Sequence, residues 1–228
     1  ELQRKNDHEI YMTSEEATPG VFNTRDHSYD YFTKLRDQYP AIQQKHYLAD
    51  SLGNFWSLAF YQLYRGEKSN KKFQTVMCPN KDRKRYYSDI FKIAVWNEKL
   101  KVYYIVFDER NDVLMMNRDM KAVGNIPVAF TNPQDPDDGP NIYDAVLDKQ
   151  GRLWLCGSTI WVYDTLLKKL TPAKLRQKID FAGMELQNMV QRGDYIYFQP
   201  SRFSFNAIYR INVNTFDCDS IQLPREIT

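Results

Sequence analysis

The chain has 228 residues, of which 43% are hydrophobic, and this is enough to bury the core of one large domain or two small ones. Its formal net charge is only +2, so it lacks the concentrated basic surface that nucleic-acid-binding proteins need. No stretch approaches the roughly 18 consecutive apolar residues of a membrane-spanning helix, and the polar start Glu1–Lys5 does not match a signal peptide.

Residues 1–45 differ in pattern from the rest of the chain. Between Asp26 and Gln44 several large residues lie at helical spacing, with Ser28 or Asp30 placed to cap the segment and Pro40 to end it. We therefore expect one short N-terminal helix in an extension that covers residues 1–45. The alternative is that these residues form an atypical first blade of the repeat that follows.

Four units with a common pattern follow, at residues 46–80, 86–128, 141–175 and 184–224. Each has a polar turn, a strand with a large aromatic residue, a second turn and a further strand. The aromatic anchors are Trp56, Tyr103, Trp154 and Tyr197, which lie 47, 51 and 43 residues apart. A period in the forties with several strands per repeat is typical of a β-propeller. We therefore predict an all-β fold with about four antiparallel blades, which either close alone or belong to a larger propeller.

The clearest unit contains the sequence Asp148-Lys149-Gln150-Gly151-Arg152-Leu153-Trp154-Leu155, followed by Val162-Tyr163-Asp164. The first unit matches it with Asp50, Gly53, Asn54, Phe55 and Trp56, then Leu63-Tyr64-Arg65. In both, a glycine follows the aspartate at a turn, where it can adopt a positive φ without steric cost.

This pattern resembles the two-component regulator propeller repeat. The resemblance covers two clear units and two loose ones, because the second and fourth units have no tryptophan at the anchor. The Gly-Thr pair that usually follows the tryptophan strand is also missing from the first unit, and Cys156-Gly157-Ser158 replaces it in the third. In that family the repeats build the extracytoplasmic sensor of hybrid histidine kinases, often in Bacteroides-like bacteria that sense glycan fragments.

The resemblance implies a ligand- or partner-sensing module of a bacterial signalling receptor, with a periplasmic or otherwise extracytoplasmic location. The 228 residues contain no kinase, receiver or DNA-binding segment, so the signalling output would lie elsewhere. The alternative is a protein-interaction scaffold without a small ligand. A carbohydrate-active propeller enzyme is the least favoured interpretation.

The motifs of common enzymes are missing. The sequence has no Gly-rich phosphate loop, no GxSxG and no HExxH, and its three histidines all lie within the first 46 residues. Its three cysteines, Cys78, Cys156 and Cys218, show no CxxC spacing, which disfavours a zinc site. The acidic loop 131–141 does not fit an EF-hand, because Gly139 and Val146 stand where ligands are required. We expect a protein that is not an enzyme, with no metal and no cofactor.

A ligand site is predicted from the position of one set of hairpins. In a propeller the hairpins between the second and third strands of all blades open on one face. Those hairpins hold the candidate ligand-binding residues Phe60, Tyr61, Arg110, Arg202, Phe203 and Phe205. Aromatic faces beside a guanidinium suit an oligosaccharide or peptide, which are the expected ligands. The alternative for Phe203 and Phe205 is packing against a neighbouring blade. A protein partner or self-association is also expected, and nucleic acid is not.

Overall fold

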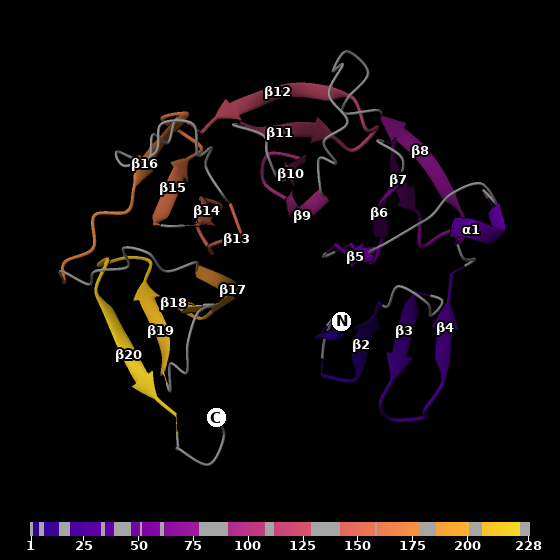
Figure 1. Ribbon diagram of the computed structural model, residues 1–228, viewed down its shortest axis with the longest axis horizontal. Helices are drawn as coiled ribbons and strands as arrows, with labels where there is room; N and C mark the ends of the chain where they lie inside the picture. Colours follow the sequence, from indigo (N-terminus) through magenta and orange to yellow (C-terminus); the bar gives the residue numbers. More distant parts are fainter. Residues whose placement is uncertain are drawn as a thin grey trace.

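The computed structural model describes residues 2–4, 7–13, 19–32, 35–38, 47–50, 52–59, 62–77, 91–107, 112–128, 142–157, 159–177, 186–200 and 207–223. These residues form five antiparallel sheets, each made of four strands that are consecutive in the sequence. The sheets are arranged as blades along an arc, with their first strands innermost (Figure 1). The expected all-β propeller architecture is thus confirmed, but the number of blades is wrong, because there are five and not four.

The strands of the first two blades come from the N-terminal third of the chain. Blade 1 consists of β1 (Leu2–Arg4), β2 (Glu9–Met12), β3 (Gly20–Asn23) and β4 (Tyr29–Tyr31). Blade 2 consists of β5 (Tyr47–Ala49), β6 (Phe55–Ala59), β7 (Gln62–Gly66) and β8 (Phe73–Met77).

The remaining three blades follow in order. Blade 3 consists of β9 (Phe91–Asn97), β10 (Val102–Phe107), β11 (Asp112–Asn117) and β12 (Ala122–Pro127). Blade 4 consists of β13 (Asp144–Leu147), β14 (Leu153–Cys156), β15 (Ile160–Asp164) and β16 (Lys169–Pro172). Blade 5 consists of β17 (Leu186–Arg192), β18 (Tyr195–Pro200), β19 (Ala207–Asn212) and β20 (Cys218–Gln222).

The helix expected within residues 26–44 is wrong. Tyr29–Tyr31 forms β4, paired with β3, and the helical part of the described chain is the single turn α1 (Leu35–Gln38). Tyr29 and Tyr31 therefore follow the two-residue period of a strand. The ring of Tyr29 lies over Gly20, where an added Cβ would come within 2.7 Å of the tyrosine Cζ atom. A side chain at position 20 would therefore displace this ring.

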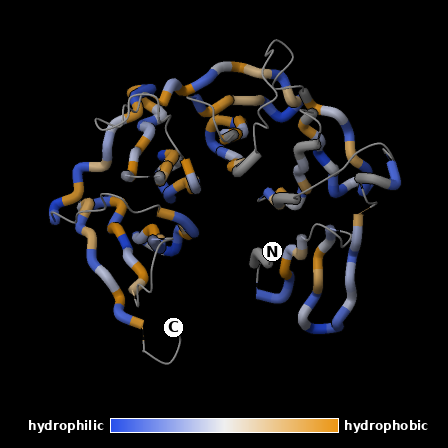
Figure 2. The backbone as a smooth tube through the Cα atoms, viewed as in Figure 1, coloured by the Kyte–Doolittle hydropathy of each residue, from blue (hydrophilic) through white to orange (hydrophobic). Residues whose placement is uncertain are grey.

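Hydrophobic and hydrophilic residues are interspersed along the strands of the blades (Figure 2). Side chains along the second strand of each blade alternate between two sides of the sheet. One residue faces the preceding blade and the next residue faces the following blade. The residues that face the following blade at equivalent positions are Tyr11, Trp56, Tyr104, Trp154 and Tyr197. Those that face the preceding blade are Ile10, Phe55, Tyr103, Leu153 and Ile196.

The anchor expected at Tyr103 is therefore one residue out of place, because Tyr104 occupies the position of the two tryptophans. The turn before β10 explains the shift. Asn97 pairs with Val102 across that turn, whereas the amide of Asp50 bonds to the carbonyl of Asn54 in blade 2. One extra residue in the turn moves each later side chain to the opposite face of the strand.

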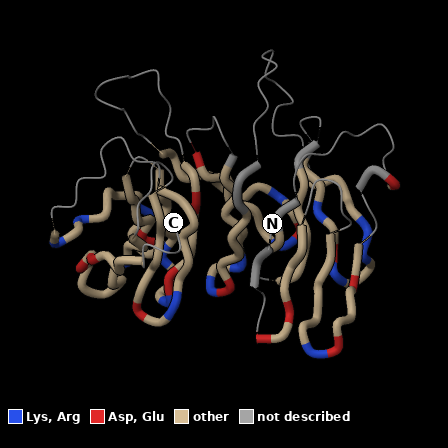
Figure 3. The backbone as a smooth tube through the Cα atoms, turned by 60° about the horizontal axis from the view of Figure 1, so that its bottom comes forward, with Lys and Arg blue, Asp and Glu red and all other residues tan. Residues whose placement is uncertain are grey.

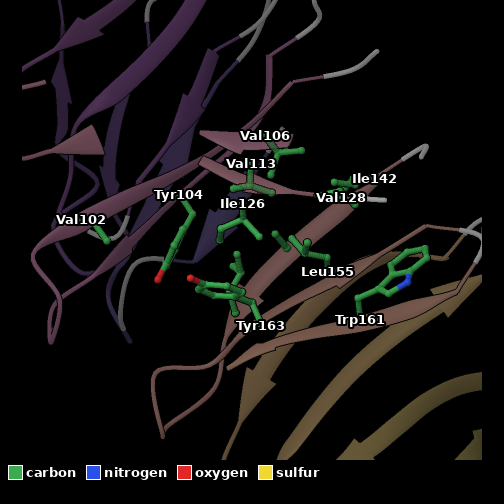
Figure 4. Packing of buried hydrophobic residues seen from close by; sticks show 12 residues of the cluster. Val102, Tyr104, Val106, Val113, Ile126, Val128, Ile142, Leu155, Trp161 and Tyr163 are labelled. Atoms are coloured by element: carbon green, nitrogen blue, oxygen red, sulfur yellow. The ribbon is translucent and has the colours of Figure 1, made fainter. Parts of the chain in front are cut away.

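The core lies between neighbouring blades. Between blades 3 and 4, Tyr104 and Val106 of β10 pack against Leu155 and Tyr163 of blade 4 (Figure 4). The rings of Tyr104 and Tyr163 meet edge to face, with centroids 6.4 Å apart. Equivalent clusters join blades 1 and 2, blades 2 and 3, and blades 4 and 5.

The meander topology gives the arc two faces. The turn face carries the connections between first and second strands and between third and fourth strands. The hairpin face carries the connections between second and third strands and the crossovers between blades. The turns of the turn face are rich in charged residues (Figure 3). Most of the connections on the hairpin face lie outside the described residues.

Candidate functional site

Two turns on the turn face share the same buried arrangement. In blade 4, Asp148 Oδ1 accepts the backbone N–H groups of Gln150 and Arg152, each at 2.9 Å, and Oδ2 accepts the indole N–H of Trp154 at 2.9 Å. In blade 2, Asp50 Oδ1 accepts the N–H of Leu52, and Oδ2 accepts the indole N–H of Trp56 at 2.8 Å. The aspartate thus holds both the turn and the tryptophan that faces the following blade.

The glycine of each turn has a backbone conformation that explains its identity. Gly53 has a φ of 85° and Gly151 a φ of 83°, which lie in the left-handed region that glycine adopts without a steric penalty. The amide of Gly151 also donates to the carbonyl of Asp148 at 2.9 Å. The spacing of aspartate, glycine and tryptophan is therefore set by one turn.

An arginine lies beside each of the two tryptophans, but it comes from a different strand position in the two blades. Arg65 of β7 lies over Trp56 and Tyr103, 5.7 and 5.6 Å from the ring centroids. Arg152, in the turn itself, lies 5.6 Å from the ring of Trp154. Its Nε donates to Asp148 at 2.6 Å. Arg65 Nη1 lies 3.6 Å from Glu67 Oε1. Both guanidinium groups therefore combine stacking with a nearby carboxylate.

These turns also tie each blade to the next. Arg152 donates to the carbonyl of Val213 in blade 5 at 2.5 Å and stacks on Phe216 at 5.5 Å. Gln150 donates to the Asn214 side chain at 2.6 Å. On the other side, Asn97 of blade 3 donates to the carbonyl of Gly151 at 3.1 Å. The turn face is therefore a continuous network across blades 3, 4 and 5.

The carboxylates of Asp50 and Asp148 are surrounded by hydrogen-bond donors, which disfavours a catalytic role for them. Asp50 and Asp148 are 1% and 5% exposed, and both oxygens of each accept hydrogen bonds from the surrounding turn. A carboxylate with its lone pairs committed and no exposed face is poorly placed to exchange protons with a substrate. The motif that carries the family resemblance is therefore a folding element rather than a catalytic or binding site.

The residues expected to bind ligand all lie outside the described part of the chain. They are Phe60, Tyr61, Arg110, Arg202, Phe203 and Phe205. The described strands that flank them end on the hairpin face, as their place between second and third strands requires. The assignment of these six residues to one ligand site remains a prediction.

On the hairpin face, the starts of β13 and β17 lie near the centre of the arc and are joined by a hydrogen bond. Asp144 Oδ2 accepts the backbone N–H of Met189 at 2.5 Å and so links blades 4 and 5. This amide lies at a β-bulge, where the register of β17 shifts between Gln187 and Val190 and Asn188 has a φ of 57°. Bulges of this kind redirect side chains and occur near functional sites. No pattern in the sequence had marked Asp144 or Asn188.

The thiol at the same end of blade 4 is held in a protonated state. Cys156 Sγ donates to the carbonyl of Leu186 at 2.9 Å. Burial, with a smaller contribution from the Asp144 carboxylate, raises the pKa of Cys156 well above 9.0. A thiolate is the nucleophilic form, so Cys156 is unsuited to covalent catalysis near neutral pH.

The described residues were compared with the requirements of a metal site and of a membrane-spanning helix. Within them, no group of three or more His, Cys, Asp or Glu side chains is placed to hold a metal ion. No helix in the same ranges is long and apolar enough to span a bilayer.

Comparison with protein-family models found no match, and comparison with curated proteins found none either. Among solved structures, the chain is similar to streptogramin B lyase, with a TM-score of 0.67 and 13% identity over 98% of this chain and 68% of that chain. It is also similar to the extracellular domain of a putative hybrid two-component system from B. thetaiotaomicron, with a TM-score of 0.62 and 11% identity over 98% of this chain and 30% of that one.

A second extracellular domain from a putative hybrid two-component system of B. thetaiotaomicron gives a TM-score of 0.57 and 14% identity, over 99% of this chain and 28% of that one. The chain therefore spans less than a third of each of these two domains. At such identities the likeness concerns the fold. The chain has the propeller fold that is found in extracellular domains of two-component systems and also in enzymes.

Proposed function

We propose that this chain is a sensing module of an extracytoplasmic signalling receptor, and that it binds a ligand or partner without catalysing a reaction. The observation that carries the proposal is the pair of buried Asp–Gly–Trp turns in blades 2 and 4. They are the features by which the sequence resembles the two-component regulator propeller repeat. The fold shared with extracellular domains of two-component systems supports the same conclusion.

The hairpin face is the proposed recognition surface. Connections on the turn face are short. The β13–β14 turn, for instance, is closed by the amide of Asp148, which donates to the carbonyl of Arg152. On the hairpin face, by contrast, residues 78–90 join blades 2 and 3, and residues 201–206 join β18 to β19. Variable connections on a rigid scaffold are where binding residues concentrate.

A non-catalytic role fits the chemistry of the described residues. The carboxylates of Asp50 and Asp148 are enclosed by donors, and the Cys156 thiol stays protonated near neutral pH. The residues proposed to contact ligand are aromatic or cationic: Phe60, Tyr61, Arg110, Arg202, Phe203 and Phe205. Such groups stack on sugar rings or peptide side chains and donate to their oxygens.

The test is a binding measurement on the purified chain against a panel of oligosaccharides and peptides, by isothermal titration calorimetry. For a compound that binds, the variant Phe203→Ala/Phe205→Ala should raise Kd by about tenfold, because truncating an aromatic anchor commonly costs more than 1 kcal/mol. The matched control is Leu166→Ala/Leu167→Ala on the turn face, which should leave Kd unchanged. Equal affinity of the wild type and the hairpin variant, or loss of binding in the control, would move the site away from the hairpin face.

A second candidate, a protein-interaction scaffold, is supported by one observation. Leu166 and Leu167, in the turn between β15 and β16, are 82% and 74% exposed. Two adjacent exposed leucines offer apolar contact area to a protein partner. In that case the Leu166→Ala/Leu167→Ala variant, and not the hairpin variant, should lose the interaction in a pull-down with the receptor's partner proteins.

A further inference from the structure

The two ends of the arc present sheet faces that are covered in every interior blade. Blades 1 and 5 lie on opposite sides of an opening in the arc (Figure 1). Blade 1 turns toward this opening the side that would face a preceding blade, and blade 5 the side that would face a following one. The burial of equivalent residues along the five blades shows what these two sides lack.

The residues that face the following blade are buried in blades 1 to 4 but only partly buried in blade 5. Tyr11, Trp56, Tyr104 and Trp154 are 2%, 0%, 0% and 0% exposed, because the next blade covers each of them. Tyr197 occupies the same position in blade 5 but is only partly buried. On the side that faces the preceding blade, the residue that is not fully buried lies in blade 1. Phe55, Tyr103, Leu153 and Ile196 are all 0% exposed, whereas Ile10 of blade 1 is only partly buried.

The two exposed sides are rich in apolar and aromatic residues, as a blade interface is. The blade 5 side also carries Arg210, ion-paired with Asp219, at the position that Arg65 occupies in blade 2. We define the blade 1 flank as Ile10, Met12, Phe22, Tyr29 and Tyr31, which strand pairing places on one side of the sheet. We define the blade 5 flank as Val190, Tyr195, Tyr197, Ile208 and Ile221, again on one side. Tyr31 is 64% exposed and Val190 is 58% exposed. Exposed sheet faces that are rich in large apolar and aromatic residues normally mark surfaces that another element covers.

We propose that the two flanks bind further antiparallel β-blades that close the ring, and that these blades belong to the same polypeptide as the five blades here. In the interior of the arc, each equivalent sheet face is covered by a neighbouring blade. An element that covers the two flanks in the same way must therefore be a β-sheet with apolar side chains on the side that faces the flank. The fold comparison supports a source in one polypeptide. The match with streptogramin B lyase covers 98% of this chain but only 68% of that single chain, so about a third of the lyase chain has no counterpart here.

The experiment compares the 228-residue chain with the product of the complete open reading frame that encodes it, by hydroxyl-radical footprinting with mass spectrometry. Met12, Tyr31 and Tyr197 should be labelled in the 228-residue chain and protected several-fold in the complete product. Tyr104 should be protected in both, and Leu166 and Leu167 should be labelled in both. These residues serve as buried and exposed references within the same sample.

A second measurement does not depend on labelling. In the complete product, Tyr197→Ala should lower Tm about as much as Tyr104→Ala, its counterpart in blade 3, whereas in the 228-residue chain it should lower Tm much less. Equal labelling of the flanks in both proteins would overturn the proposal. So would a reading frame that encodes no further blades, or protection that appears only as the 228-residue chain self-associates, measured by light scattering.

Discussion

Trp154 donates its indole N–H to the carboxylate of Asp148, six residues earlier, at 2.9 Å, although both side chains are almost fully buried. The same carboxylate closes the turn between β13 and β14 and accepts from Arg152. One aspartate therefore fixes a turn, an aromatic anchor and the cation that reaches the next blade.

Replacing Asp148 with Ala should be strongly destabilising. The change leaves two turn amides and the Trp154 indole without their acceptor and leaves Arg152 without its carboxylate. Breaking a buried charged network typically costs about 3–5 kcal/mol, so the midpoint of urea unfolding should fall sharply. Asp119→Ala, at an exposed turn of blade 3, is the control and should stay within about 0.5 kcal/mol of the wild type. Similar midpoints for both variants would show that the network contributes little.

The Gly151→Ala variant isolates the effect of backbone conformation. An added Cβ would meet nothing closer than the Asn97 Nδ2 atom at 3.8 Å, so there is space for the methyl group. The φ of 83° is nevertheless unfavourable for an L-residue, and the variant should lose about 1–2 kcal/mol of unfolding free energy. Gly124→Ala in β12 has similar space without a positive φ, and it should be neutral or slightly stabilising. A Gly151→Ala variant as stable as Gly124→Ala would contradict this account.

Arg152→Lys should weaken the contact between blades 4 and 5. Lysine keeps the charge but loses the planar group that stacks on Trp154 and Phe216 and reaches Asp148 and Val213 together. We expect a loss of about 1–2 kcal/mol in unfolding free energy, measured by urea titration. The conservative change Arg118→Lys, at an exposed turn, is the matched control. If the two lysine variants unfold at the same urea concentration, the planar shape of the group is unimportant here.

Stability should fall at alkaline pH. Burial raises the pKa of Cys156 well above its ordinary 9.0, and burial with the nearby Asp219 raises the pKa of Cys218 to about 12. The folded state therefore holds protons that the unfolded state releases, so the stabilisation is complete below about pH 9 and is lost progressively above it. Urea midpoints measured between pH 7 and about pH 11 should show this decline, with a smaller slope in Cys156→Ala.

Thiol reactivity provides an independent check of the same burial. In a Cys78→Ser background, Cys156 and Cys218 should react slowly with a thiol reagent at pH 8 in the native chain and quickly after unfolding, since both thiols are buried. Fast reaction of both thiols in the native chain would show that blades 4 and 5 separate readily.

The sequence alone determined the class of fold, because an aspartate, a glycine and a tryptophan at fixed spacing encode a turn and the strand that follows it. Blades 2 and 4 carry this signature in full, as Asp50 to Trp56 and Asp148 to Trp154. Blade 1 has neither the glycine nor the tryptophan, and its one strong signal is Tyr11, 45 residues before Trp56. The sequence pattern therefore favoured a helical extension over the alternative of an atypical first blade. A strand of four residues with one aromatic anchor is too weak a local pattern to identify by itself.

The tertiary structure decided which side of each strand is buried and where the blades meet. A single extra residue in the turn before β10 exchanged Tyr103 and Tyr104 between the two sides of blade 3, and the anchor spacing did not reveal this. The link from Asp144 to the bulge at Met189 joins residues 45 positions apart, so no local pattern predicts it. The topology of the strands predicted which face holds the hairpins, but the partly exposed Tyr197 and Ile10 became evident only with the blades in place. Burial depends on neighbours that are distant in the sequence, and only the assembled arc brings them together.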